Sequence, residues 1–104
     1  MIEEVKKRLK GYSKSNVKFS NHATQMIILR EGNKSEVINE LLNPVNLIDA
    51  FPEDNKTVLI FRLSGTRTLK LPVIFNKGGR KCLYIVTYIK RYRPWQRIVK
   101  EDVQ

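Results

Sequence analysis

The chain has one cysteine, Cys82, and one histidine, His22, among its 104 residues. A single cysteine excludes an intrachain disulfide and is typical of a reducing compartment. These two residues lie 60 positions apart, the ten acidic residues are scattered, and no glycine-rich phosphate loop is present. Such spacings do not fit a zinc, calcium or nucleotide site. We therefore expect no metal and no cofactor.

Long apolar runs are also missing. None approaches the ~20 residues that a membrane-spanning helix needs, and the N-terminal Met-Ile-Glu-Glu lacks the layout of a signal peptide. A hydrophobic fraction of 41% is ordinary for a globular protein. The sequence thus predicts one cytoplasmic domain over residues 1–104, with a basic C-terminal tail from about residue 93. It leaves a homo-oligomer open.

Acidic residues are absent from most of the second half. Residues 1–51 contain eight Lys or Arg and six Asp or Glu, whereas residues 55–100 contain twelve Lys or Arg and no acid. The net charge is +10. Such a surface repels itself unless its partner is anionic. Nucleic acid is the first candidate partner, an anionic membrane surface the second and an acidic protein the third. Improved solubility is the alternative that needs no partner.

Helical patterns occupy the first half of the chain. Three segments carry apolar residues at helical spacing: residues 2–10, 20–30 and 36–43. Gly11 ends the first segment, and Ser20 and Ser35 are good N-caps for the other two. Pro44 ends the third because it disfavours helical geometry at the residue before it.

The period changes to that of strands in the second half. Four segments are expected: residues 46–51, 57–63, 66–75 and 80–92. Ser64-Gly65 is a tight-turn signal, and Pro72 moves the third strand towards an edge or a bulge. The sequence therefore predicts an α+β domain in which N-terminal helices pack on a C-terminal antiparallel β-meander of about four strands.

The last strand combines a core face with basic and aromatic residues. Alternation assigns the core face to Leu83, Ile85 and Ile89. The opposite face then receives Tyr84, Tyr88, Lys90 and Tyr92. Tyrosines stack on unpaired bases, and Lys and Arg hold phosphates. The alternative is that part of this second face is buried under helices.

His22 is the one side chain whose ordinary pKa lies near neutrality. With cations around it, a histidine can cleave RNA without a metal, because the 2′-hydroxyl of the substrate supplies the nucleophile. The helix N-terminus at Ser20 favours a neutral imidazole, which can act as a base. The alternatives are that His22 only packs against or caps its helix, and that Cys82 is a nucleophile; a buried, inert thiol is the simpler interpretation of Cys82.

Three stretches resemble a known family. Phe19-Ser-Asn-His22-Ala23, a helix ending at Arg30, and Ser35 to Asn43-Pro44 are similar to the small DUF4258-type domains, and Ile85-Val86-Thr87-Tyr88 is similar to their closing strand. The likeness covers about residues 1–92. The family is grouped with the RelE-like and BrnT-like toxins of toxin–antitoxin modules. One position departs from its pattern, because Met26 stands where the family usually has an arginine.

The resemblance implies a metal-independent endoribonuclease that a cognate antitoxin protein neutralises. RNA, either free or as mRNA on the ribosome, would be the substrate, and no membrane partner is expected. The expected catalytic residues are His22 as general acid/base, Arg30 on the phosphate, and Tyr88, which would stack on a base or donate a hydrogen bond. The expected nucleic-acid-binding residues are Arg62, Arg67, Lys70, Arg80, Lys81, Lys90, Arg91, Tyr92 and Arg93. The alternative is a non-catalytic nucleic-acid-binding protein of a virus or mobile element.

Overall fold

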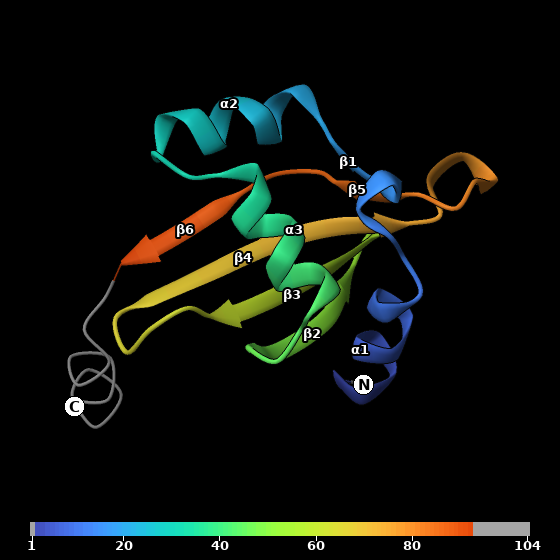
Figure 1. Ribbon diagram of the computed structural model, residues 1–104, viewed down its shortest axis with the longest axis horizontal. Coiled ribbons are helices and arrows are strands. Elements are labelled where there is room, and N and C mark those ends of the chain that lie inside the picture. The colour runs from blue at the N-terminus through green and yellow to red at the C-terminus, as the bar shows by residue number, and fades with distance from the viewer. Residues whose placement is uncertain (1, 93–104) are drawn as a thin grey trace.

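The computed structural model describes residues 2–92, which form three helices and a six-stranded sheet (Figure 1). The helices are α1 (Ile2–Lys10), α2 (Asn21–Leu29) and α3 (Lys34–Leu42), with short 3₁₀ turns η1 (Lys14–Asn16) and η2 (Lys77–Gly79). The strands are β1 (Val17–Phe19), β2 (Leu47–Glu53), β3 (Lys56–Arg62), β4 (Arg67–Phe75), β5 (Leu83–Ile85) and β6 (Ile89–Tyr92). The α+β prediction is confirmed. None of the helices in residues 2–92 is long and apolar enough to cross a membrane.

The sheet differs from the expected antiparallel meander of about four strands. Its order is β1-β5-β4-β3-β2, with β6 also paired to β4. β1 runs parallel to β5, with Val17 opposite Leu83, and the other pairs are antiparallel. The edge strand was missed because it has only three residues and pairs with a segment far along the chain.

The predicted last strand, residues 80–92, is interrupted opposite Pro72. Val73 pairs with Ile85 and Lys70 pairs with Ile89, so three residues stand opposite two. The Val86 N–H donates to the Pro72 carbonyl at 2.9 Å. The proline nitrogen on the same side has no hydrogen, so the ladder is broken there and one extra residue is accommodated as a bulge. The prediction of an edge or a bulge in the strand that contains Pro72 is therefore not met: β4 is a central strand, and the bulge lies in the chain that pairs with it.

The extra residue reverses the faces after Ile85. Tyr88 joins the core and is 2% exposed, whereas Ile89 pairs with Lys70 on the opposite face. The prediction that Tyr88 points outward and Ile89 inward is therefore wrong. A shift of one residue exchanges the two faces of a strand.

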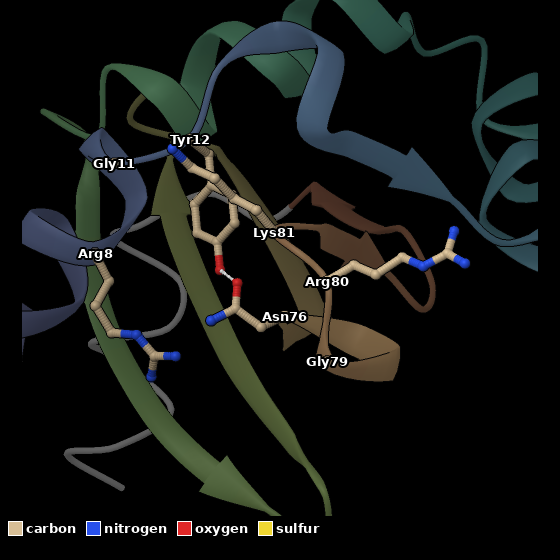
Figure 2. Close-up of a pocket in the computed structure, with 7 residues that line it drawn as sticks. All are labelled: Arg8, Gly11, Tyr12, Asn76, Gly79, Arg80 and Lys81. Carbon is tan, nitrogen blue, oxygen red and sulfur yellow. Dashed lines mark hydrogen bonds between the residues drawn. The ribbon is translucent and has the colours of Figure 1, made fainter.

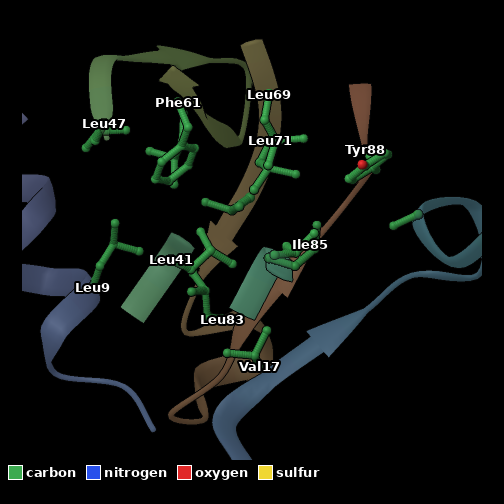
Figure 3. Close-up of a cluster of buried hydrophobic side chains, with 14 of the residues drawn as sticks. Leu9, Val17, Leu41, Leu47, Phe61, Leu69, Leu71, Leu83, Ile85 and Tyr88 are labelled. Carbon is green, nitrogen blue, oxygen red and sulfur yellow. The ribbon is translucent and has the colours of Figure 1, made fainter. Parts of the chain in front are cut away.

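All three helices cover one face of the sheet (Figure 3). They contribute Leu9, Ile27 and Leu41, among others, to a continuous apolar cluster. The strands contribute residues that pair across the sheet and so share that face: Leu47, Ala50, Leu59, Phe61, Leu69, Leu71, Val73, Leu83 and Ile85. The opposite face carries no helix of residues 2–92, and we call it the open face.

The caps of α2 and α3 fix how these helices meet the sheet. The Ser20 hydroxyl accepts from the Ala23 N–H at 2.9 Å, as expected for an N-cap, and donates to the Val86 carbonyl at 2.6 Å. The α2 N-terminus is thereby attached to the bulge. α3 starts earlier than predicted, because Asn33 rather than Ser35 caps it; the Asn33 side chain accepts from the Ser35 N–H at 2.7 Å.

Candidate nucleic-acid interface

Cations lie in a row across the open face near the β3–β4 hairpin. Arg62 pairs with Thr68, and Thr68 pairs with Arg91, so these three residues occupy adjacent strands on one face. Lys70 lies in the next row, between Ile60 and Ile89. Neighbouring residues in a row are about 5 Å apart, which brings three cations within the span of one or two nucleotides.

The middle of the open face is apolar. Phe51 pairs with Val58, and Val58 pairs with Pro72. Val58 is fully buried and Pro72 is buried, whereas the Phe51 ring is half-exposed. The acidic residues of this face, Asp49 and Glu53, both belong to β2, the edge strand farthest from β6.

A second aromatic ring lies at the other end of the open face. Tyr84 pairs with Ile74 on one side and Lys18 on the other. Its half-exposed ring carries the Lys77 ammonium 3.5 Å from the ring centroid. The ammonium is close enough for a favourable cation–π contact. An aromatic ring held beside a lysine provides a surface for a base next to a phosphate.

The structure divides the predicted nucleic-acid-binding residues among four places. Arg62, Lys70 and Arg91 share the open face. Lys90 pairs with Leu69 and therefore points to the helix-covered side, where it is half-exposed. Arg67 is exposed at the start of β4, opposite the backbone of Tyr92. Arg80 and Lys81 lie after η2, about 27 Å away along nine-residue β4. Arg93 and the basic tail lie outside the described residues.

The three predicted catalytic side chains do not converge. His22 is exposed in the first turn of α2, and Arg30 is exposed at its C-cap, about 12 Å along the helix. Tyr88 is buried, and its hydroxyl lies beside Gly32, beyond the C-terminal end of α2. Burial, with a smaller contribution from Glu36, raises the pKa of the Tyr88 hydroxyl. In this arrangement Tyr88 supports the core and cannot stack on a base.

A cavity of about 410 Å³ between α1 and the loop after β4 was not foreseen (Figure 2). Its lining residues are Arg8, Gly11, Tyr12, Asn76, Gly79, Arg80 and Lys81. Charge in the sequence indicates Arg80 and Lys81 as binding residues, but nothing in the sequence indicates Arg8, Tyr12 or Asn76. Nothing local signals that the end of α1 meets a loop more than 60 residues later; the Asn-Lys-Gly-Gly turn was the available clue.

Cys82, at the edge of this region, is half-exposed rather than buried. Within residues 2–92 no group of three His, Cys, Asp or Glu side chains is placed to hold a metal ion. The thiol also lies in a different element from His22, which is at the start of α2.

No family model matches this chain, and comparisons with curated proteins and with solved structures find no match either. The likeness to toxin domains therefore rests on the motif residues alone and stays a prediction.

Proposed function

We propose that the protein binds single-stranded nucleic acid, with RNA as the first choice, across the open face of its sheet. The observation that supports this most is the row of Arg62 and Arg91, beside Lys70, on a face that also presents the rings of Phe51 and Tyr84. Cations hold the backbone phosphates while aromatic rings stack on unpaired bases. An acidic protein could use the same cations but gives the two rings no partner of their own.

The charge distribution favours a path along β4. The acids of the open face lie on β2, so a strand that follows β4 from the hairpin to η2 avoids them. The ~27 Å length of β4 is long enough for several nucleotides of an extended single strand. Base-paired helices fit this face less well, because their bases are not available for stacking.

Salt dependence of binding tests the proposal. We would measure fluorescence anisotropy of a labelled single-stranded RNA against the wild type and against Lys70→Ala/Arg91→Ala. Binding weakens as salt rises, so log K has a negative slope against log salt. Loss of two phosphate contacts should make this slope less steep by about 1.4. The matched control is Lys7→Ala/Lys14→Ala, which removes two exposed lysines that belong to α1 and η1 rather than to the strands of the open face. Equal losses in both variants, or no binding by the wild type, would contradict the proposal.

An endoribonuclease, neutralised by an antitoxin, is the second candidate. Its support is the exposed His22 in the first turn of α2, whose imidazole is open to solvent on the helix-covered side of the sheet. The imidazole would take the proton of a 2′-hydroxyl, whose oxygen would then attack the adjacent phosphorus. The bond to the 5′-oxygen would break, leaving a 2′,3′-cyclic phosphate and, after protonation, a 5′-hydroxyl.

Cleavage is tested separately from binding. Labelled RNA is incubated with the wild type in EDTA, with and without ribosomes, beside His22→Ala and a 2′-O-methyl RNA. Activity predicts cyclic-phosphate ends with the wild type alone and intact 2′-O-methyl RNA. Intact RNA in every reaction would contradict the nuclease hypothesis and would not affect the proposal that the protein binds RNA.

A further inference from the structure

The cavity at the end of α1 is rich in positive charge. Three of its lining residues, Arg8, Arg80 and Lys81, are cations, and none is acidic. The ion pair recorded among residues 2–92 joins Lys6 to Glu3 at 4.0 Å, so no carboxylate of that part of the chain neutralises these three. Cations gathered without a counter-charge repel each other unless an anion joins them.

Arg8 is held in place by an aromatic ring rather than by an acid. Its guanidinium carbon lies 4.0 Å from the centroid of the Phe75 ring. The Tyr12 ring also lies beside Phe75, with 6.2 Å between the two ring centroids. A guanidinium fixed on a ring keeps its N–H donors available at its edge. The position is therefore pre-organised for an anion.

Asn76 supplies neutral donors next to Arg8. The Tyr12 hydroxyl donates to the Asn76 side-chain oxygen at 2.6 Å, which leaves the amide nitrogen with its two hydrogens as donors. Figure 2 shows this nitrogen turned to the side on which Arg8 lies. Burial raises the pKa of the Tyr12 hydroxyl, which therefore remains a donor at neutral pH.

The backbone after Asn76 is shaped to return the chain to α1. Asn76, Gly78 and Gly79 have φ values of 53°, 71° and 74°, all in the left-handed region. A Cβ on Gly79 would meet nothing within 4 Å, so its φ rather than crowding calls for glycine. This turn places Lys81 beside the end of α1, whereas Arg80 extends away from the other lining side chains (Figure 2). Arg80 therefore adds charge rather than a contact.

We propose that this cavity binds a phosphate monoester through Arg8 and Asn76, as found at the end of a nucleic-acid strand or on a free nucleotide. Lys81, whose ammonium lies beside Gly11, and Arg80 add positive charge around that position. A monoester carries a charge near −2 at neutral pH and three acceptor oxygens, so it gains more than an internal phosphodiester does from a guanidinium, an amide and the surrounding positive charge.

The turn that lines the cavity also reaches the open face. Lys77, from the same turn as Gly79, lies over Tyr84 on that face, whereas Arg8 lies over Phe75 on the helix-covered side. A strand that crosses Tyr84 would therefore pass around this turn to bring its terminal phosphate to Arg8. Binding of the phosphorylated end of a nucleic-acid strand rests on the proposed function, whereas binding of a free phosphate monoester does not.

Paired oligonucleotides test the site. One RNA sequence is prepared with a 5′-phosphate, with a 3′-phosphate and with hydroxyls at both ends, and each is titrated against the wild type. We expect about tenfold tighter binding of one phosphorylated form, because charge-assisted hydrogen bonds to the extra charge are gained. Asn76→Asp puts a carboxylate into the cavity with little change of shape, tolerates the positive φ, and should reduce the ratio to about one.

The matched control is Asn21→Asp, which introduces the same charge at the exposed start of α2 and should keep the ratio. Adenosine monophosphate and inorganic phosphate are titrated in parallel by NMR, following the Gly79 and Lys81 amides. One outcome is that no RNA binds, but adenosine monophosphate shifts these amide signals and Asn76→Asp abolishes the shift. The phosphate site is then supported, with a free nucleotide as its ligand, and the proposed binding of RNA is contradicted. Equal binding of all three RNAs, with no shift of these amides, overturns the site and leaves the open face untouched.

Discussion

The two faces of the sheet are made from alternating residues of the same strands, yet their side chains have different tasks. On β3, Leu59 and Phe61 are fully buried under the helices, whereas Ile60 is half-exposed and Arg62 exposed on the open face. Burial of the first set stabilises the fold. The second set adds little to stability and places charge and aromatic surface where a partner can reach them. Substitutions on the helix-covered face should therefore alter unfolding, and substitutions on the open face outside its buried middle at Val58 and Pro72 should alter binding.

The largest expected difference in the free energy of unfolding is between the Phe61→Ala and Phe51→Ala variants. Removing the fully buried Phe61 ring should lower the free energy of unfolding by about 3–5 kcal/mol. Removing the half-exposed Phe51 ring should cost less than about 1.5 kcal/mol, but weaken single-stranded RNA binding about tenfold if a base stacks on it. Urea unfolding measures the change in stability, and fluorescence anisotropy measures the change in RNA affinity. Similar unfolding costs would contradict the division between faces.

A smaller loss is expected at Gly32, on the helix-covered side. A Cβ there would lie 2.6 Å from the Tyr88 hydroxyl oxygen, so Gly32→Ala should destabilise the protein by about 2 kcal/mol. Gly65→Ala is the control, since a Cβ at Gly65 meets nothing within 4 Å. Adding Tyr88→Leu should relieve part of the cost, measured as a non-additive double-mutant cycle. Additive effects would show that the close approach to Tyr88 is not the cause.

The smallest effect concerns alkaline pH. Burial, and then Glu36, raises the pKa of Tyr88 above its ordinary value of 10.0. The unfolded chain therefore loses this proton first, and the stability due to the protonated hydroxyl is complete below pH 10 and declines above it. Tyr88→Phe should lose less stability than the wild type between neutral pH and about pH 11. Parallel curves for the two proteins would contradict a buried Tyr88.

The helices were largely predictable because their signals are local. Apolar spacing and Ser20 placed α1 and α2 nearly to the residue. The start of α3 was missed because Asn33 and Ser35 are both plausible caps, and the local fit of Asn33 to two N–H groups decided between them.

The faces of the last strands could not be assigned from alternation. That assignment depends on a bulge caused by Pro72, which belongs to a different strand. The cavity was unpredictable for the same reason: Tyr12 and Asn76 are 64 residues apart, and only tertiary packing brings them together. Charge alone identified Arg62, Lys70 and Arg91, but not that they share a face.

The parallel pair of β1 and β5 also bears on synthesis of the chain at the ribosome. Val17 pairs with Leu83, and the Ser20 N–H donates to the Ile85 carbonyl. The first strand and the start of α2 therefore cannot make these contacts until residues 83–85 have been synthesised. Such distant pairing slows folding and leaves apolar helix surface exposed in the interval. A nascent chain that stalls before residue 83 would keep α1 and α3 over β2–β4 but leave β1 without its neighbour. Arrested chains of increasing length should therefore gain protease resistance in one late step.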